Sequence, residues 1–189
     1  MILSQFQSVG QGLFTQGLVS SHSGNLSIRL GERLIITRRG SRLDCLTEHD
    51  LIETGINKND RFTPLASSEL PVHRAIYQET PALAIVHAHP PHAIALSLIE
   101  TEIIPNGAEG VAMLGRVPVL GWHMDVKPGG MADIISHSLK QCKLVIARGH
   151  GSFAIGQLLE EAHDYTTTIE ESCRVICLLR SLRVGTDKE

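Results

Sequence analysis

The stretch LAIVHAHPP, residues 83–91, decides the fold of this chain. An apolar run that contains β-branched residues and ends at a double proline predicts a buried strand and its end. Because successive side chains of a strand point to opposite faces, His87 and His89 are expected on one face, at the strand terminus. Two imidazoles delivered together form half of a metal site, although an isolated His-x-His pair is more often solvated or bonded to nearby carbonyls. The rest of the chain decides between these interpretations.

Length and composition limit the classes of protein to consider. The 189 residues fit a single domain over 1–189, and 42% hydrophobic with 20% charged residues is typical of a soluble globular protein. A net charge of −3 gives no basic face for phosphate backbones, so nucleic acid is not expected as a partner. The chain has neither a leader-like start nor an apolar run of roughly 20 residues, so we expect a cytoplasmic protein without a membrane partner.

Cysteine and aromatic residues narrow the field further. The cysteines show no paired short spacings of the zinc-ribbon kind, which favours reduced, structural thiols. They are Cys45, Cys142, Cys173 and Cys177. Aromatic residues make up only 4% of the chain, so platforms for stacking bases or sugar rings are scarce. Ligand recognition is therefore expected to be mostly polar.

Hydrophobic periodicity predicts alternating helices and strands. Helical spacing is found over residues 1–18, 68–79, 93–98, 131–141 and 158–182. Strand patterns are found over residues 26–30, 33–37, 51–54, 83–87, 117–120 and 144–147. The first two strands flank a two-residue Gly31-Glu32 turn and predict a hairpin, and serine is expected as the N-cap of the second helix. Without repeats or a linker, this order predicts one α/β domain with a central sheet between helices.

A second strand end carries another histidine. The apolar run 144–147 leads into Gly149-His150-Gly151, where the glycines allow backbone or ligand to approach closely. Three imidazoles with one open position describe a catalytic divalent-metal site rather than a closed structural one. Glu69, at the start of the second helix, adds a carboxylate that could ligate the metal in the free enzyme and move a proton when substrate is bound.

Six short motifs then occur in one order over roughly residues 5–180. They are GNLS at 24–27, Ile36-Thr37 with Gly40, SSE at 67–69, HAH at 87–89, RGHG at 148–151 and EEA at 160–162. In these motifs the chain resembles the class II aldolase and adducin family, and within it the L-fuculose-1-phosphate aldolase-like members. The resemblance implies a three-layer α/β/α sandwich with a central mixed, largely antiparallel sheet.

The same resemblance implies a reaction and a ligand set. His87, His89 and His150 would hold Zn²⁺, with Mn²⁺, Co²⁺ and Fe²⁺ left open, and Glu69 would be both metal ligand and proton shuttle. A small phosphorylated ketose would be cleaved to dihydroxyacetone phosphate and an aldehyde through a metal-stabilised enediolate. The family also implies a homotetramer with active sites at the subunit interfaces.

Substrate phosphate would be held by backbone amides and small side chains. By resemblance these positions are Asn25, Gly40, Ser67 and Ser68. The two serines precede a helix, whose free N–H groups and dipole favour an anion. Local roles remain open beside this one: the glycine and asparagine as turn formers, and the serine as a helix cap.

The chain departs from the aldolase pattern at two places. Arg39 stands where those enzymes carry serine or threonine, and residues 106–115 contain Glu109 but not the tyrosine used as a proton donor. Glu109 is therefore a second catalytic candidate beside a plain surface carboxylate. These departures keep open a dehydratase, epimerase or decarboxylase of a sugar phosphate or sugar acid. A non-enzymatic, adducin-like interaction domain is the contrasting interpretation, which the full histidine set and Glu69 disfavour.

The other histidines are assigned to surface or packing positions. His92 follows the double proline and is the one among them that could lie near the metal. They are His22, His49, His73, His92, His123, His137 and His163.

Overall fold

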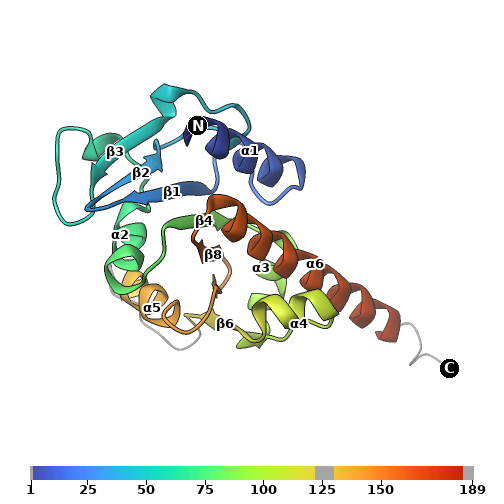
Figure 1. Cartoon of the computed structure of the whole chain (residues 1–189). Coiled ribbons are helices and arrows are strands. Elements are labelled where there is room, and N and C mark those ends of the chain that lie inside the picture. The colour runs from blue at the N-terminus through green and yellow to red at the C-terminus, as the bar shows by residue number, and fades with distance from the viewer. Residues whose placement is uncertain (1, 122–129, 185–189) are drawn as a thin grey trace.

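Strand β4, Ala84–Ala88, lies in the middle of an eight-stranded sheet in the computed structural model, which describes residues 2–121 and 130–184 (Figure 1). The strand order is β3-β2-β1-β4-β8-β7-β6-β5. All neighbouring pairs are antiparallel except β6 and β7, which are parallel. The expected mixed, largely antiparallel sheet is confirmed.

The elements follow the expected alternation closely. The helices are α1 Ile2–Thr15, α2 Leu70–Glu79, α3 Pro91–Ser97, α4 Ala108–Leu114, α5 Gly130–Ser138 and α6 Leu159–Val184. The strands are β1 Asn25–Leu30, β2 Arg33–Thr37, β3 Leu51–Gly55, β4, β5 Glu102–Ile103, β6 Val117–Leu120, β7 Leu144–Ala147 and β8 Gly151–Gly156. Three short 3₁₀ turns are Leu43–Cys45, Glu48–Asp50 and Thr63–Leu65.

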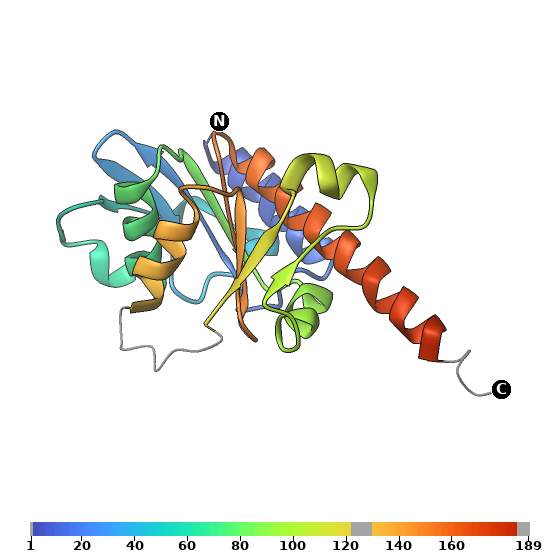
Figure 2. The same ribbon diagram turned by 90° about the horizontal axis from the view of Figure 1, so that it is seen from below.

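Helices cover both faces of the sheet, so the expected three-layer sandwich is confirmed. Helices α2 and α5 lie on one face, while α1, α3, α4 and α6 lie on the other (Figures 1 and 2). Each face has its own buried apolar cluster, which is what a sheet covered on both sides requires.

The alternation along β4 explains how one strand serves both layers. Ala84, Val86 and Ala88 pack in the cluster under α1, α3 and α6, whereas Ile85 packs under α2 and α5. His87 follows the parity of Ile85 and therefore points toward the α2 layer. The neighbouring strands place Asn25 and Phe153 directly opposite His87 in register. The sheet thus presents a polar position under α2, at the end of β4.

Three elements were not expected from the sequence: β5, β8 and α4. Strand β5 is only two residues long. Strand β8 has glycine at both ends, and helix α4 contains Gly110, so neither shows a clear apolar period. A side chain at Gly110 would lie 2.6 Å from both the Pro105 Cβ and the Ser172 Oγ, so close packing on α6 demands a glycine there.

Several further expectations can be compared with the structure. All four cysteines are free thiols, as expected. A search of residues 2–121 and 130–184 finds no helix that combines the length and apolar character of a membrane span. The single domain over 1–189 and the cytoplasmic location stay predictions.

Close packing of α1 on the Leu43–Cys45 turn gives a test of the fold. A side chain at Gly10 would overlap the backbone oxygen of Leu43, which cannot withdraw as a flexible side chain could. We therefore expect Gly10→Ala to lower the free energy of unfolding by about 1–3 kcal/mol despite the higher helix propensity of alanine. Urea unfolding at fixed protein concentration measures the change.

The matched control is Ser8→Ala, an exposed position on the same helix. It gains helix propensity without new contacts and is expected to change stability by less than about 0.5 kcal/mol. An unfolding midpoint for Gly10→Ala at or above that of the wild type would show that α1 does not pack as described.

Candidate metal centre

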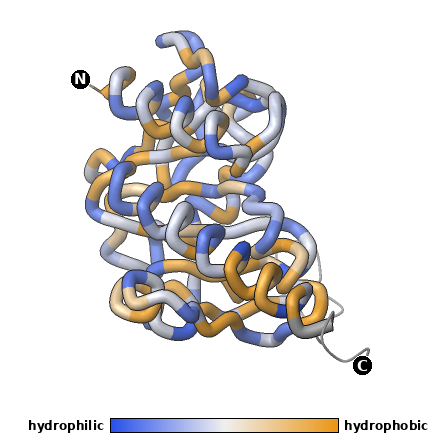
Figure 3. The backbone as a smooth tube through the Cα atoms, turned by 90° about the vertical axis from the view of Figure 1, so that its right-hand side faces the viewer, coloured by the Kyte–Doolittle hydropathy of each residue, from blue (hydrophilic) through white to orange (hydrophobic). Residues whose placement is uncertain are grey.

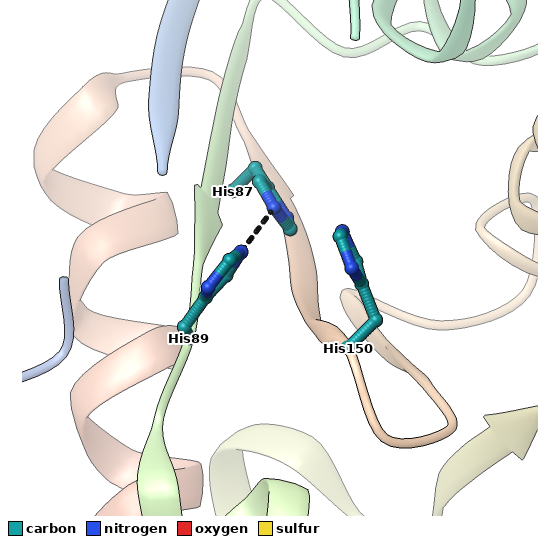
Figure 4. Close-up of side chains that lie close together, drawn as sticks. All are labelled: His87, His89 and His150. Carbon is teal, nitrogen blue, oxygen red and sulfur yellow. Dashed lines mark hydrogen bonds between the residues drawn. The ribbon is translucent and has the colours of Figure 1, made fainter. Parts of the chain in front are cut away.

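Three imidazoles converge at the end of β4, as the sequence predicted. The ligand nitrogens of His87, His89 and His150 all lie within 4.8 Å of one another (Figure 4). The Nε2 atoms of His87 and His89 are 3.0 Å apart, and the ring centroids of the three residues are 4.9–5.1 Å apart. This spacing lets one ion touch all three rings.

Backbone features fix each histidine. His87 is 1% exposed in β4, and His89 follows the strand end with its N–H donating to the Leu18 oxygen at 2.7 Å. His150 closes a four-residue turn between β7 and β8, in which its own N–H donates to the Ala147 oxygen at 3.0 Å. Gly149 holds the third position of that turn with φ +67°, a conformation that favours glycine.

Gly151 allows the two strand ends to meet. A Cβ there would overlap the Ala88 oxygen and come within 2.8 Å of the His89 ring and 3.1 Å of the His87 ring. The glycine after His150 is therefore needed for close approach, which is one of the two roles the sequence left to it.

The Nδ1 hydrogen bond of His87 leaves a lone pair on its Nε2, which lies 3.0 Å from the His89 Nε2. Its Nδ1 donates to the Ser152 carbonyl at 2.9 Å, which places the ring proton on Nδ1. Burial lowers the pKa of His87 to about 3, so the ring is neutral near pH 7. The Nε2 lone pair then points into the centre. A second ring nitrogen anchored to a backbone carbonyl is the usual arrangement of a metal-ligating histidine.

Glu69 completes the centre from the start of α2. Its Oε1 lies 3.0 Å from the His150 Nε2, and its Oε2 lies 3.0 Å from the His87 Nε2. Asn25 Nδ2 also donates to Oε2, at 2.7 Å. The carboxylate, expected near the metal from the sequence, therefore faces the three imidazoles.

The donor set fits a divalent cation. A neutral His87 with its proton on Nδ1 sets a nitrogen lone pair 3.0 Å from a carboxylate oxygen, and two acceptors at that distance repel unless a cation lies between them. Three imidazoles and a carboxylate are ligands that suit zinc and neighbouring divalent ions. His87, His89 and His150, with Glu69, would hold that ion.

Electrostatics keep Glu69 ionised. Burial alone would raise the pKa of Glu69. The hydrogen bonds from His150 and Asn25 and the attraction of the nearby imidazoles lower it by more, so the resulting pKa is about 2. The hydrogen bond to Glu69 raises the pKa of His150, so that ring is the one most easily protonated in the metal-free centre. A metal must displace that proton, which makes its binding weaker in acid.

The expected phosphate residues come from three segments: the start of β1, the turn after β2 and the segment before α2. Asn25 is buried, and both ends of its amide are already bonded, to Glu69 and to His73. Ser67 is buried, and its backbone N–H donates a hydrogen bond to the Thr37 oxygen, while Ser68 is exposed. The turn that contains Gly40, with φ +77°, follows directly after β2. Their role in holding phosphate stays a prediction.

The expected serine cap of the second helix is wrong in detail. The helix begins at Leu70 with Glu69 as its N-cap, and no side chain caps it. Instead the Ser67 Oγ accepts from the Glu69 N–H at 3.2 Å. The serine therefore orients the backbone of the carboxylate residue rather than the first turn of the helix.

Two candidates are not brought to the centre within this chain. Glu109 is exposed in the first turn of α4, beside a cavity of about 330 Å³ between α4 and α6, on the sheet face opposite His87. His92 donates from its backbone N–H to Glu170 of α6, and its Nδ1 lies 2.6 Å from the same carboxylate. His92 therefore contacts α6 and not the three imidazoles, which agrees with its assignment to a surface or packing position. His123 lies outside the described residues.

The sequence interpretation missed a buried polar row next to the centre. His73, Ser27 and Tyr77 are all at most 1% exposed and hydrogen-bond to one another below Asn25. His73 was assigned to the surface or to packing. The spacing of Glu69, His73 and Tyr77 at four-residue intervals, which places polar groups on one face of a helix, was the signal that could have found it.

An α/β sandwich with a three-histidine centre at two strand ends defines the class of protein. The Class II Aldolase and Adducin N-terminal domain profile matches residues 4–177. The chain belongs to the class II aldolase and adducin family.

Individual relatives cover nearly the whole chain. The L-fuculose phosphate aldolase of Methanococcus maripaludis strain S2 is 26% identical over 97% of this chain and 100% of its own length. The 3-oxo-tetronate 4-phosphate decarboxylase of Haemophilus influenzae is 28% identical over 96% of this chain and 90% of its own. The crystal structure of l-fuculose-1-phosphate aldolase from Thermus thermophilus has a TM-score of 0.89 at 36% identity, covering 97% of this chain and 96% of that one.

The metal centre gives a direct test. We expect the wild-type protein to bind one Zn²⁺ per chain and to unfold at a higher temperature when Zn²⁺ is added. Because loss of an outer partner alone costs roughly 10–100-fold in affinity, His87→Ala and His150→Ala should each weaken binding by at least about 100-fold. Metal analysis after dialysis and competition with a chromophoric chelator measure both.

His137→Ala is the matched control, since His137 is exposed on α5 away from the centre. It should bind Zn²⁺ as the wild type does. Equal Zn²⁺ affinity in the His150→Ala variant would contradict the assignment of the site.

Proposed function

We propose that this protein is a divalent-metal-dependent aldolase that cleaves a small phosphorylated ketose, similar to fuculose 1-phosphate, into dihydroxyacetone phosphate and an aldehyde. The observation that carries the proposal is the Glu69 carboxylate facing the imidazole centre, with one oxygen 3.0 Å from the His87 Nε2 and the other 3.0 Å from the His150 Nε2. The relatives named as fuculose phosphate aldolases support the same reaction class.

The residues divide the work of carbon–carbon cleavage. When bound, Zn²⁺ or a similar ion would act as a Lewis acid on the ketose oxygens and stabilise the enediolate charge left by cleavage. His87, His89 and His150 would orient the sugar by holding that ion in place. As substrate enters, Glu69 would leave the imidazoles that keep it ionised, take up a proton from solvent and deliver it to the carbon from which the aldehyde has left.

The phosphate end of the substrate would lie at the α2 N-terminus. Ser67 and Ser68 precede this ten-residue helix, and its N-terminal dipole favours an anion. Gly40 would supply backbone contact from the neighbouring turn. Asn25 would act mainly on Glu69, because both ends of its amide are occupied.

A decarboxylase is the second candidate, supported by the relative named as a 3-oxo-tetronate 4-phosphate decarboxylase and by Glu109 in place of a tyrosine. Decarboxylation of a 3-oxo acid also breaks a carbon–carbon bond and leaves enolate charge, so the same centre would serve both reactions. Dehydration or epimerisation on this scaffold is less well supported, and an adducin-like interaction domain would have no use for the ligand set.

We further propose a homotetramer with active sites between subunits. The C-terminal half of α6 extends beyond the sheet (Figure 2) and contains many apolar residues (Figure 3). Leu178 is 56% and Leu182 is 69% exposed there, next to exposed Val175 and Leu179. A row of exposed leucines on one helix is costly in water and favours burial against another copy.

The reaction is tested with the zinc-loaded protein and fuculose 1-phosphate. We expect aldehyde release by the wild type, abolished by removal of metal with a chelator and restored by Zn²⁺. Glu69→Gln keeps the shape of the side chain but loses the proton carrier, so kcat should fall by about 10²–10⁴-fold. Coupled detection of dihydroxyacetone phosphate measures the rate.

Glu171→Gln is the control, since Glu171 is exposed on α6. If no ketose phosphate in a small panel releases an aldehyde, the aldolase proposal fails, and release of CO₂ from a phosphorylated 3-oxo acid would support the second candidate. Aldol cleavage by Glu109→Gln at nearly the wild-type rate would count against any role for that carboxylate.

The assembly is tested by light scattering after size exclusion. The wild type should show four times the chain mass, and Leu178→Asp should dissociate because a charge cannot be buried cheaply in an apolar interface. Leu158→Asp, an exposed leucine just before α6, is the matched control and should leave the mass unchanged. A monomeric wild type would contradict the proposal.

A further inference from the structure

A continuous row of hydrogen bonds runs from the buried end of α2 to the centre. Tyr77 Oη lies 2.8 Å from Ser27 Oγ, which lies 2.6 Å from His73 Nδ1. His73 Nε2 lies 2.6 Å from Asn25 Oδ1, and Asn25 Nδ2 lies 2.7 Å from Glu69 Oε2. Every member except Glu69 is at most 5% exposed.

Two regular periods create this row. Glu69, His73 and Tyr77 are spaced by four residues, which places them along one face of α2. Asn25 and Ser27 are two residues apart on β1, so both point toward that helix. Helix and strand side chains therefore alternate along the row.

The donor and acceptor roles can be assigned from the Glu69 end. An ionised carboxylate only accepts, so the amide nitrogen of Asn25 faces it and the amide oxygen faces His73. His73 Nε2 must then carry the ring proton, and its Nδ1 accepts from the Ser27 hydroxyl. Ser27, whose one proton is used, accepts from Tyr77. All the bonds run in one direction, toward Glu69.

The surroundings favour this single arrangement. Burial lowers the pKa of His73 to about 4 and raises the pKa of Tyr77, so the first is neutral and the second keeps its proton near pH 7. Each polar group in the row has its partner, which a buried network needs in order to be favourable.

We propose that His73, supported by Ser27 and Tyr77, is a positioning residue that fixes the Asn25 amide and thereby aims the ionised Glu69 carboxylate at the three histidines. Without the His73 donor, the Asn25 amide could rotate and present its oxygen to the carboxylate. Glu69 would then lose a hydrogen bond and its fixed direction. No proton needs to travel along the row. The catalytic part of this inference rests on the proposed function.

The first test is spectroscopic and needs neither metal nor substrate. In ¹⁵N-labelled protein, long-range proton–nitrogen spectra should show the His73 proton on Nε2 and one strongly downfield Asn25 side-chain amide proton. We expect His73→Leu to shift that amide proton back toward its ordinary position and Ser27→Ala to release the single tautomer. A wild-type spectrum with the proton on Nδ1 would overturn the proposal.

The second test uses the zinc-loaded enzyme. Since loss of an outer partner costs roughly 10–100-fold, His73→Leu should lower kcat by that factor while KM changes by less than about threefold. His73→Gln keeps a donor toward Asn25 and should recover most of the rate. Ile76→Val alters the same helix at a fully buried apolar position and should keep the wild-type kcat.

Equal kcat values for His73→Leu and Ile76→Val would overturn the positioning role, and equal losses in the Leu and Gln variants of His73 would do the same. If His73→Leu does not fold, kcat and the Asn25 amide signal are compared between the wild type, Ser27→Ala and His73→Gln instead. A wild type inactive on every ketose phosphate would defeat the proposed function alone, because the Asn25 amide signal is read without turnover.

Discussion

The side-chain alternation of β4 is the constraint on which the site depends. On one face of the strand, Ala84, Val86 and Ala88 fill the core beneath α6. On the other face, Ile85 and then His87 lie beneath α2. A shift of register by one residue would place His87 in the apolar cluster and move Ala84, Val86 and Ala88 out of it. The strand is therefore held in place by its small and branched residues, and the position of His87 is a consequence of that packing.

The centre also contains a pair of polar atoms that do not satisfy each other, the His87 Nε2 and a Glu69 carboxylate oxygen. His87 is anchored through Nδ1 to Ser152, which turns a bare nitrogen toward the Glu69 oxygen at 3.0 Å. Asn25 holds that carboxylate from the other side. A protonated ring could relieve the contact, but burial opposes charge on His87 and lowers its pKa. A divalent cation relieves it without that cost, so the protein stabilises the geometry that a metal needs before one arrives.

Much of this could be predicted from the sequence, and the reasons for the exceptions are specific. The strand run before His87, the glycines around His150 and the position of Glu69 each carry a local signal in the sequence. Strand β8 and helix α4 carry none, because glycines demanded by close packing erase their periodicity. His73 was missed for another reason. Its partners Ser27 and Asn25 lie 46 and 48 residues away in the sequence, and only the packing of α2 on β1 brings them together.

The choice of reaction lies in what the single chain does not bring to the centre. A divalent ion held by the histidines would stabilise the enolate charge of an aldol cleavage or of a decarboxylation equally well. A second acid or base must discriminate between them, since only the aldol reaction requires a proton to leave a hydroxyl group. Glu109 lies on the opposite face of the sheet, so it can act on substrate only from a neighbouring copy of the chain. In the proposed tetramer, assembly and reaction specificity would be coupled: a lone protomer would hold the metal and the phosphate, and the packing of subunits would decide which bond is broken.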